Sequence, residues 1–129
     1  MNLSNDKKEQ SISKNMNSAL KKASAELAVL AVIVDKQETY GFEIKKTLMD
    51  YSDGFFSLGT GSIYTILNRL IEQGFISPHY HSGDKKKNRV YYRATTEGRN
   101  FLSIYRLCFS QNLKHIFGML EKLSIPINS

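Results

Sequence analysis

The stretch Gly61-Ser62-Ile63-Tyr64-Thr65-Ile66-Leu67-Asn68-Arg69-Leu70-Ile71-Glu72-Gln73-Gly74 decides the fold. Its apolar side chains follow the i, i+3, i+4, i+7, i+8 spacing of one helix face, and they are Ile63, Ile66, Leu67, Leu70 and Ile71. Gly74 supplies the C-terminal stop. The pattern predicts an amphipathic helix whose opposite face is polar and free to contact a ligand.

The polar face of this helix follows from a turn of about 100° per residue. The side chains that point away from the apolar stripe are Thr65, Asn68, Arg69 and Glu72, with Ser62 and Tyr64 on the flanks. Asn and Arg offer bidentate hydrogen bonds to adenine and guanine edges, and Ser and Thr are short enough for close approach. Glu72 lies at the far end, where phosphate would repel it, and is expected to be solvated.

Two further helices precede this one. Apolar residues from Ser18 to Val34 recur at helical spacing and then surround the helix, so it must be buried on more than one side. Asp35 to Glu38 is expected to form a turn, and a second helix is expected over Thr39 to Tyr51 with Thr39 as its N-cap. The three glycines between Ser52 and Gly61 predict a loop.

A β-hairpin and a long helix follow. The segments Phe75 to Tyr80 and Arg89 to Ala94 are expected to form strands, and His81 to Asn88 to join them as a charged tip. We call this hairpin the wing. Thr95 or Thr96 caps a last helix that is expected to run to about Ser124, because Pro126 forbids continuation.

The 129-residue chain carries 18 Lys and Arg against 12 Asp and Glu, a formal net charge of +6. Of this excess, +4 lies between His79 and Arg93, with the cations Lys85, Lys86, Lys87 and Arg89 in or beside the tip. A basic balance is expected of a protein that binds a polyphosphate. On its own, such a lysine run only solvates a turn; beside a helix-turn-helix pattern, contact with phosphate is favoured.

The order of elements predicts a mainly α protein with a small β-hairpin, a winged helix-turn-helix followed by a long C-terminal dimerisation helix. We expect a mobile tail at 1–16, the DNA-binding domain at 17–94, the dimerisation helix at 95–125 and a short tail at 126–129. The last helix, about 42 Å long at 1.5 Å per residue, overhangs one small domain and stays apolar to its end, so it requires a partner. A second copy of the chain is the simplest partner.

Four fragments of the chain, in the right order and spacing, closely resemble the PadR family of winged-helix transcriptional regulators. They are Tyr40-Gly41-Phe42-Glu43-Ile44, Gly61 to Leu70, Gln73-Gly74-Phe75-Ile76, and Arg89 to Thr95 with Gly98. The resemblance covers residues 25 to 105, and the single long last helix is similar to the short subfamily. Ala94 stands where the family has a larger aliphatic residue, and the chain has no Trp.

The resemblance implies a homodimeric repressor of transcription, released from its operator by an aromatic or other small hydrophobic effector. Members of the short subfamily pack the last helix on the partner's first helix. The residues expected at that interface are Leu27, Leu30, Val34, Leu102, Tyr105, Phe109, Ile116, Leu120 and Leu123. In place of Trp, the effector pocket is expected to use Phe101, Tyr105 and Phe109.

The residues expected to bind double-stranded DNA share an exposed position on the predicted winged helix. They are Tyr40, Ser62, Tyr64, Thr65, Asn68, Arg69, Lys85, Lys86, Lys87 and Arg89. For Tyr40 and Tyr64, a packing role is as well supported as a DNA contact. For a rigid dimer, the operator is expected to be an inverted repeat.

Other functions are disfavoured by the composition. The longest apolar run, Leu27 to Val34, is too short to span a membrane, and the polar N-terminus is unlike a secretory signal, so a cytoplasmic protein is expected. The single Cys108 is expected to pack as a small hydrophobe, and His79 and His81 lack a third metal ligand. No acid–base pair suggests an enzyme, and no cofactor or metal is expected. A protein-interaction adaptor on the same scaffold remains the alternative.

Overall fold

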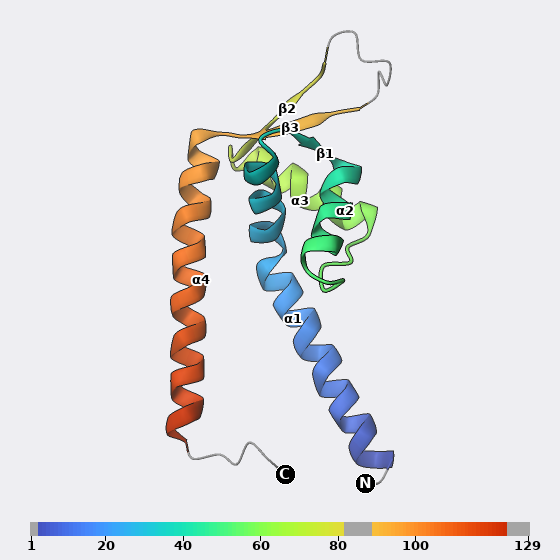
Figure 1. Cartoon of the computed structure of the whole chain (residues 1–129), viewed down its shortest axis with the longest axis vertical. Helices are drawn as coiled ribbons and strands as arrows, with labels where there is room; N and C mark the ends of the chain where they lie inside the picture. The colour runs from blue at the N-terminus through green and yellow to red at the C-terminus, as the bar shows by residue number, and fades with distance from the viewer. Residues whose placement is uncertain (1–2, 82–88, 124–129) are drawn as a thin grey trace.

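The computed structural model describes residues 3–81 and 89–123. Within them the elements follow the order α1 (Leu3–Lys36), β1 (Thr39–Tyr40), α2 (Gly41–Tyr51), α3 (Thr60–Glu72), β2 (Ile76–His79), β3 (Tyr91–Ala94) and α4 (Thr96–Lys122). In Figure 1, α2, α3 and the strands gather around the C-terminal half of α1, while α4 and the N-terminal half of α1 extend away from this body and diverge. The predicted winged helix-turn-helix with a long last helix is confirmed.

The core lies where α1, α2 and α3 meet. Its fully buried aliphatic side chains are Val29, Leu30 and Ile33 of α1, Ile44 of α2, and Ile63, Leu67 and Leu70 of α3. The α3 stripe is therefore confirmed, with Ile66 also buried and Ile71 only partly buried. Each such side chain stabilises the fold by roughly 1.5–3 kcal/mol relative to an exposed position, and α3 is held firmly by its apolar face.

The sheet has the strand order β1-β3-β2, and both pairings are antiparallel. The sequence predicts β2 and β3 but not β1, a two-residue strand in which Thr39 lies opposite Tyr92. Thr39 is consequently buried rather than acting as the N-cap of α2, and its hydroxyl donates to Glu43 at 2.7 Å. Tyr92 is buried in this sheet, and burial raises the pKa of its phenol.

The expected tail at 1–16 is wrong for residues 3–16, which belong to α1. Neither Gly nor Pro occurs between Leu3 and Lys36, and most residues there tolerate a helix well. A helix that is already anchored in the core gains one hydrogen bond for each residue added, so it extends beyond its packed part without side chains buried in the core.

Helix α4 begins as predicted, because the Thr95 hydroxyl accepts a hydrogen bond from the Gly98 amide at 3.0 Å. The Thr95 amide also donates to the Phe75 carbonyl at 3.0 Å. The Thr95 hydroxyl also donates to the Gly74 carbonyl at 2.6 Å, so the bonds from Thr95 to Phe75 and Gly74 join the start of α4 to the α3–β2 turn. Cys108 is exposed on α4 in the single chain, and its packing against a second protomer stays a prediction. Among the described residues, no helix is both long enough and apolar enough to cross a membrane.

Candidate nucleic-acid interface

Helix α3 presents its polar face to solvent. Ser62, Thr65 and Asn68 are exposed, while the stripe on the opposite side is buried. The Thr65 hydroxyl donates to the Gly61 carbonyl at 2.9 Å, which keeps this side chain close to the helix backbone. The face is thus shallow, polar and rigidly backed, as a surface that enters a DNA groove must be.

The side of α3 that faces α2 contains a small pocket with both polar and apolar lining residues. Tyr64 lies directly over Gly41, where a Cβ atom would come within 2.8 Å of the Tyr64 hydroxyl oxygen. A pocket of about 260 Å³ is lined by Gly41, Phe42, Lys45, Thr60, Ile63 and Tyr64. The Lys45 ammonium donates to the Thr60 hydroxyl at 3.5 Å.

This pocket also lies at the starts of α2 and α3, whose first backbone N–H groups have no partner within their own helices. An ammonium group, two hydroxyls and helix N-terminal N–H groups are the chemistry that holds a phosphate. Tyr64 thus has the packing role that its sequence left open and also lines this pocket. Its contact with DNA stays a prediction.

The opposite side of α3 faces α1 and contains an ion pair. The Arg69 guanidinium donates to the Glu26 carboxylate at 2.5 Å. Arg69 is one of the predicted base readers, and both side chains are partly exposed. A guanidinium held in this way reaches a base or a phosphate only if it shares or releases the Glu26 carboxylate. Glu26 is a residue that the sequence did not single out.

The base of the wing is an aromatic and cationic cluster. The Arg89 guanidinium lies 3.9 Å from the centre of the Tyr40 ring, and Tyr40 meets Tyr91 edge to face at 5.7 Å. The ring of His81 lies 4.2 Å from that of Tyr91. Two predicted DNA contacts, Tyr40 and Arg89, are thereby brought together at the start of α2.

The predicted contacts Lys85, Lys86 and Lys87 lie outside the described residues.

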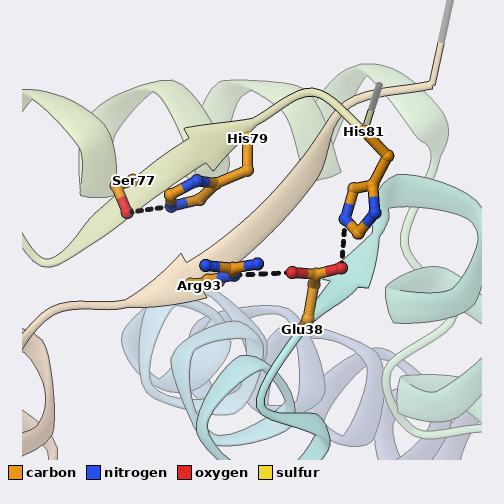
Figure 2. Close-up of polar contacts among 5 residues, drawn as sticks. All are labelled: Glu38, Ser77, His79, His81 and Arg93. Carbon is orange, nitrogen blue, oxygen red and sulfur yellow. Dashed lines mark hydrogen bonds and ion pairs between the residues drawn. The ribbon is translucent and has the colours of Figure 1, made fainter. Parts of the chain in front are cut away.

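Glu38 connects the turn after α1 to both arms of the hairpin, through Arg93 of β3 and His81 just after β2. Figure 2 shows its carboxylate between Arg93, which donates at 2.5 Å, and His81. The hydrogen bond from Arg93 lowers the pKa of Glu38 against a smaller opposing effect of desolvation, and the charges of Arg93 and His81 add to the lowering. His79 instead contacts the Ser77 hydroxyl at 2.9 Å. The two histidines therefore have different partners.

No group of three potential metal ligands occurs among the residues that the structure describes.

The sequence missed Glu26, Glu38, Gly41 and Lys45 as parts of this surface. Glu26 and Glu38 pair with arginines 43 and 55 residues away, so no local spacing signals them. Gly41 and Lys45 could have been found from their places in the first two turns of α2, beside Tyr40.

The expected dimer residues divide into two groups. Ile116 and Leu120 of α4 and Leu123, which directly follows it, are 52%, 45% and 54% exposed. Those that are partly buried between α1 and α4 are Leu27, Val34, Leu102, Tyr105 and Phe109. The prediction that Leu30 lies at the dimer interface is wrong, because its side chain is fully buried in this chain's own core.

The residues expected in the effector pocket lie in two different places. Phe109 lines an apolar groove of about 460 Å³ between α1 and α4, together with Phe55, Phe56, Leu113 and Phe117 among others. Phe101 stacks on Phe75 at 4.3 Å, and the Tyr105 hydroxyl donates to the Ala23 carbonyl at 2.8 Å. Those two side chains do not line the groove, so they belong to the packing of α4 on the body and not to this groove.

Comparisons with known proteins agree with this architecture. A model of the transcriptional regulator PadR-like family matches residues 29–104. An uncharacterized protein from Lysinibacillus sphaericus is 28% identical over 75 residues, which are 58% of this chain and 68% of that protein. A crystal structure of a PadR family transcriptional regulator from Eggerthella lenta has a TM-score of 0.76 at 24% identity, and the match covers 87% of this chain and 95% of that one. A PadR family regulator from hypervirulent Clostridium difficile has a TM-score of 0.65 at 26% identity, over 75% and 98% of the two chains.

Proposed function

Because this chain belongs to the PadR-like family of transcriptional regulators, we propose that it is a homodimeric DNA-binding repressor of the cytoplasm that a small hydrophobic or aromatic effector releases. The observation that carries the proposal is the outer face of α3. That face is polar, exposed and backed by a fully buried stripe, and the side chains on it are those that contact base edges.

The surroundings of α3 support contact with a duplex rather than with a single strand. On one side, Lys45, Thr60 and Tyr64 form a pocket with phosphate-binding chemistry. At the wing base, Arg89 is positioned over Tyr40. Phosphate contacts that flank a polar helix fix its register in the major groove, and the helix then reads the bases.

Dimerisation would use α4. Its exposed apolar side chains in the last turns include Ile116, Phe117, Leu120 and Leu123, more than a monomeric helix needs. We assign residues 17–94 to the DNA-binding domain and 95–125 to the dimerisation helix, with α1 shared between them. The apolar groove at Phe109 and Phe117 is the place we assign to the effector, since its lining is almost wholly apolar.

The proposal is tested by selecting DNA from a random duplex pool with the full-length protein, followed by binding titrations on the selected sequence. Asn68→Ala should weaken binding to that sequence by roughly 1–3 kcal/mol and relax the base preference, because a bidentate base contact is lost. Asn100→Ala is the matched control, since Asn100 is exposed on α4 away from this face.

Enrichment of one sequence, with the loss confined to Asn68→Ala, would support the proposal. A protein that enriches no sequence and binds no duplex would instead be an adaptor built on a winged helix. Equal losses on selected and random DNA would demote Asn68 to a contact with the backbone.

A further inference from the structure

Helix α1 carries lysines at a strict seven-residue interval from its first turns to its middle. Lys7, Lys14 and Lys21 all belong to this uninterrupted helix. Seven residues make nearly two turns, so successive lysines drift by only about 20° around the axis. We call these three side chains the basic ridge. Lys7 and Lys14 are exposed, and Lys21 is partly exposed.

The face around the basic ridge contains no acidic residue. Its other members are neutral and polar: Gln10, Ser11, Asn17 and Ser18, all exposed. Asp6 and Glu9 lie roughly 80° and 140° around the axis from the ridge. Lys, Ser, Asn and Gln side chains are those that contact DNA phosphates, whereas a face that is merely solvated usually mixes both signs of charge.

The opposite face of the same helix segment is apolar. Ile12, Met16 and Leu20 are exposed there at four-residue spacing. The segment therefore has an apolar side and, opposite it, a basic side. The apolar stripe continues toward Leu27, which lines the grooves between α1 and α4.

The basic ridge ends beside the polar face of α3. A groove of about 500 Å³ between α1 and α3 is lined on one side by Lys21, Lys22 and Glu26, and on the other by Ser62, Thr65 and Arg69. Ala25, Leu58 and Ile66 also line it. Its rims carry three cations against the single carboxylate of Glu26, which already pairs with Arg69. The groove is thus cationic and borders the polar face of α3.

From Lys7 to Lys21 the ridge extends for about 21 Å at 1.5 Å per residue. That length corresponds to about six base pairs of duplex, in which each strand presents a phosphate every 3.4 Å along the axis. Figure 1 shows the N-terminal end of α1, before its groove with α3, clear of α2, α3 and α4. The whole ridge precedes residue 29, where the match to the family begins.

We propose that the basic ridge, together with Lys22, binds the phosphate backbone of duplex DNA beside the bases that α3 contacts. The proposal rests on the proposed DNA-binding function and extends its contact surface along α1. Lys21 and Lys22 hold the strand next to α3, and Lys14 and Lys7 hold phosphates farther out.

The test compares two double variants of the full-length protein on a long duplex of mixed sequence, by titration at several salt concentrations. Lys7→Gln/Lys14→Gln removes two ridge cations. Lys8→Gln/Lys122→Gln removes the same charge elsewhere, since Lys8 lies off the ridge and Lys122 is in the last turn of α4. Gln keeps a helix propensity close to that of Lys, and circular dichroism verifies that each variant is folded.

The ridge variant should reduce the slope of log K against log salt by roughly one to two units, because each lost phosphate contact removes about 0.9. The control variant should retain the wild-type slope. Hydroxyl-radical footprints of the ridge variant on the selected operator should lose protection at their outer edges only.

A wild type that binds DNA, with equal slopes for both variants, would overturn the role of the ridge and leave the proposed function intact. A wild type that binds no duplex would overturn both. Lys21→Gln/Lys22→Gln provides a second measurement: an unchanged slope and footprint there would remove the α1–α3 groove from the interface.

Discussion

Gly98 sits where the first turn of α4 passes the α3–β2 turn at very short range. A Cβ atom at this position would lie 2.0 Å from the Phe75 carbonyl oxygen and 2.9 Å from its carbon. The same oxygen accepts the hydrogen bond from the Thr95 amide. Backbone contacts backbone here, so no side-chain rotation relieves the overlap, and a glycine is required for α4 to leave the body at this angle.

Gly98→Ala should therefore destabilise the protein by about 1–3 kcal/mol or more, since the helix must shift away from Phe75. Denaturant unfolding of the full-length chain measures the change. Gly118→Ala on the same helix is the control, because nothing lies within 4 Å of a Cβ there, and it should gain up to about 1 kcal/mol from helix propensity. Similar stabilities for the two variants would contradict this account of Gly98.

Individual side chains of the candidate site were predictable where one helix decides their direction. The exposed positions of Ser62, Thr65 and Asn68 follow from the α3 period alone. The partner of Arg69 does not, because Glu26 comes from another helix and only the packing of α1 on α3 brings the two together. Tertiary ion pairs of this kind leave no mark on local spacing.

At the level of elements, a strong apolar period identified α3 and α4 together with the packed part of α1. The strand β1 was missed because two residues carry no period, and it forms only because β3 offers an unpaired edge. The N-terminal half of α1 was missed for a different reason. Its helix is continued from the packed half and has no core-facing stripe to reveal it.

The exposed apolar side of α4 predicts that a second protomer packs against this helix. If a second protomer packs there, Leu120→Glu places a charge in that contact without a partner and should weaken the dimer at least tenfold. Sedimentation or light scattering across a concentration series measures the shift toward monomer. Gln111→Glu adds the same charge at an exposed polar position of α4 and should leave the mass unchanged.

A wild-type chain that sediments as a monomer at every concentration would contradict the dimer itself. A Leu120→Glu variant that keeps the dimer mass would instead show that the interface lies elsewhere on α4.

At the level of the whole molecule, two copies joined through α4 would hold two α3 helices at a fixed separation. For a two-fold dimer on B-DNA, half-sites about one turn apart, near 34 Å, match this arrangement. Because α4 extends beyond the body (Figure 1), a dimer joined through this helix would set the separation by the α4 contact.

The selected operator should therefore be an inverted repeat with one preferred spacing. Inserting about five base pairs between its halves turns them to opposite faces of the duplex, since a turn contains about 10 to 10.5 base pairs. Affinity should fall to that of a single half-site, measured by titration of matched duplexes. Equal affinity for both spacings would mean that the two DNA-binding domains are not held rigidly.

The continuity of α1 from Leu3 to Lys36 has a consequence for how the chain tolerates changes in length. One residue inserted between Lys22 and Ala25 would turn everything before it by about 100° about the helix axis, and the basic ridge would leave its side of the molecule. A seven-residue insertion would restore the phase to within about 20° and move the ridge outward by about 10.5 Å. The effect of an insertion in this segment should therefore follow the helical period and should not grow steadily with its length. Natural variants of the chain should differ there by whole helical repeats.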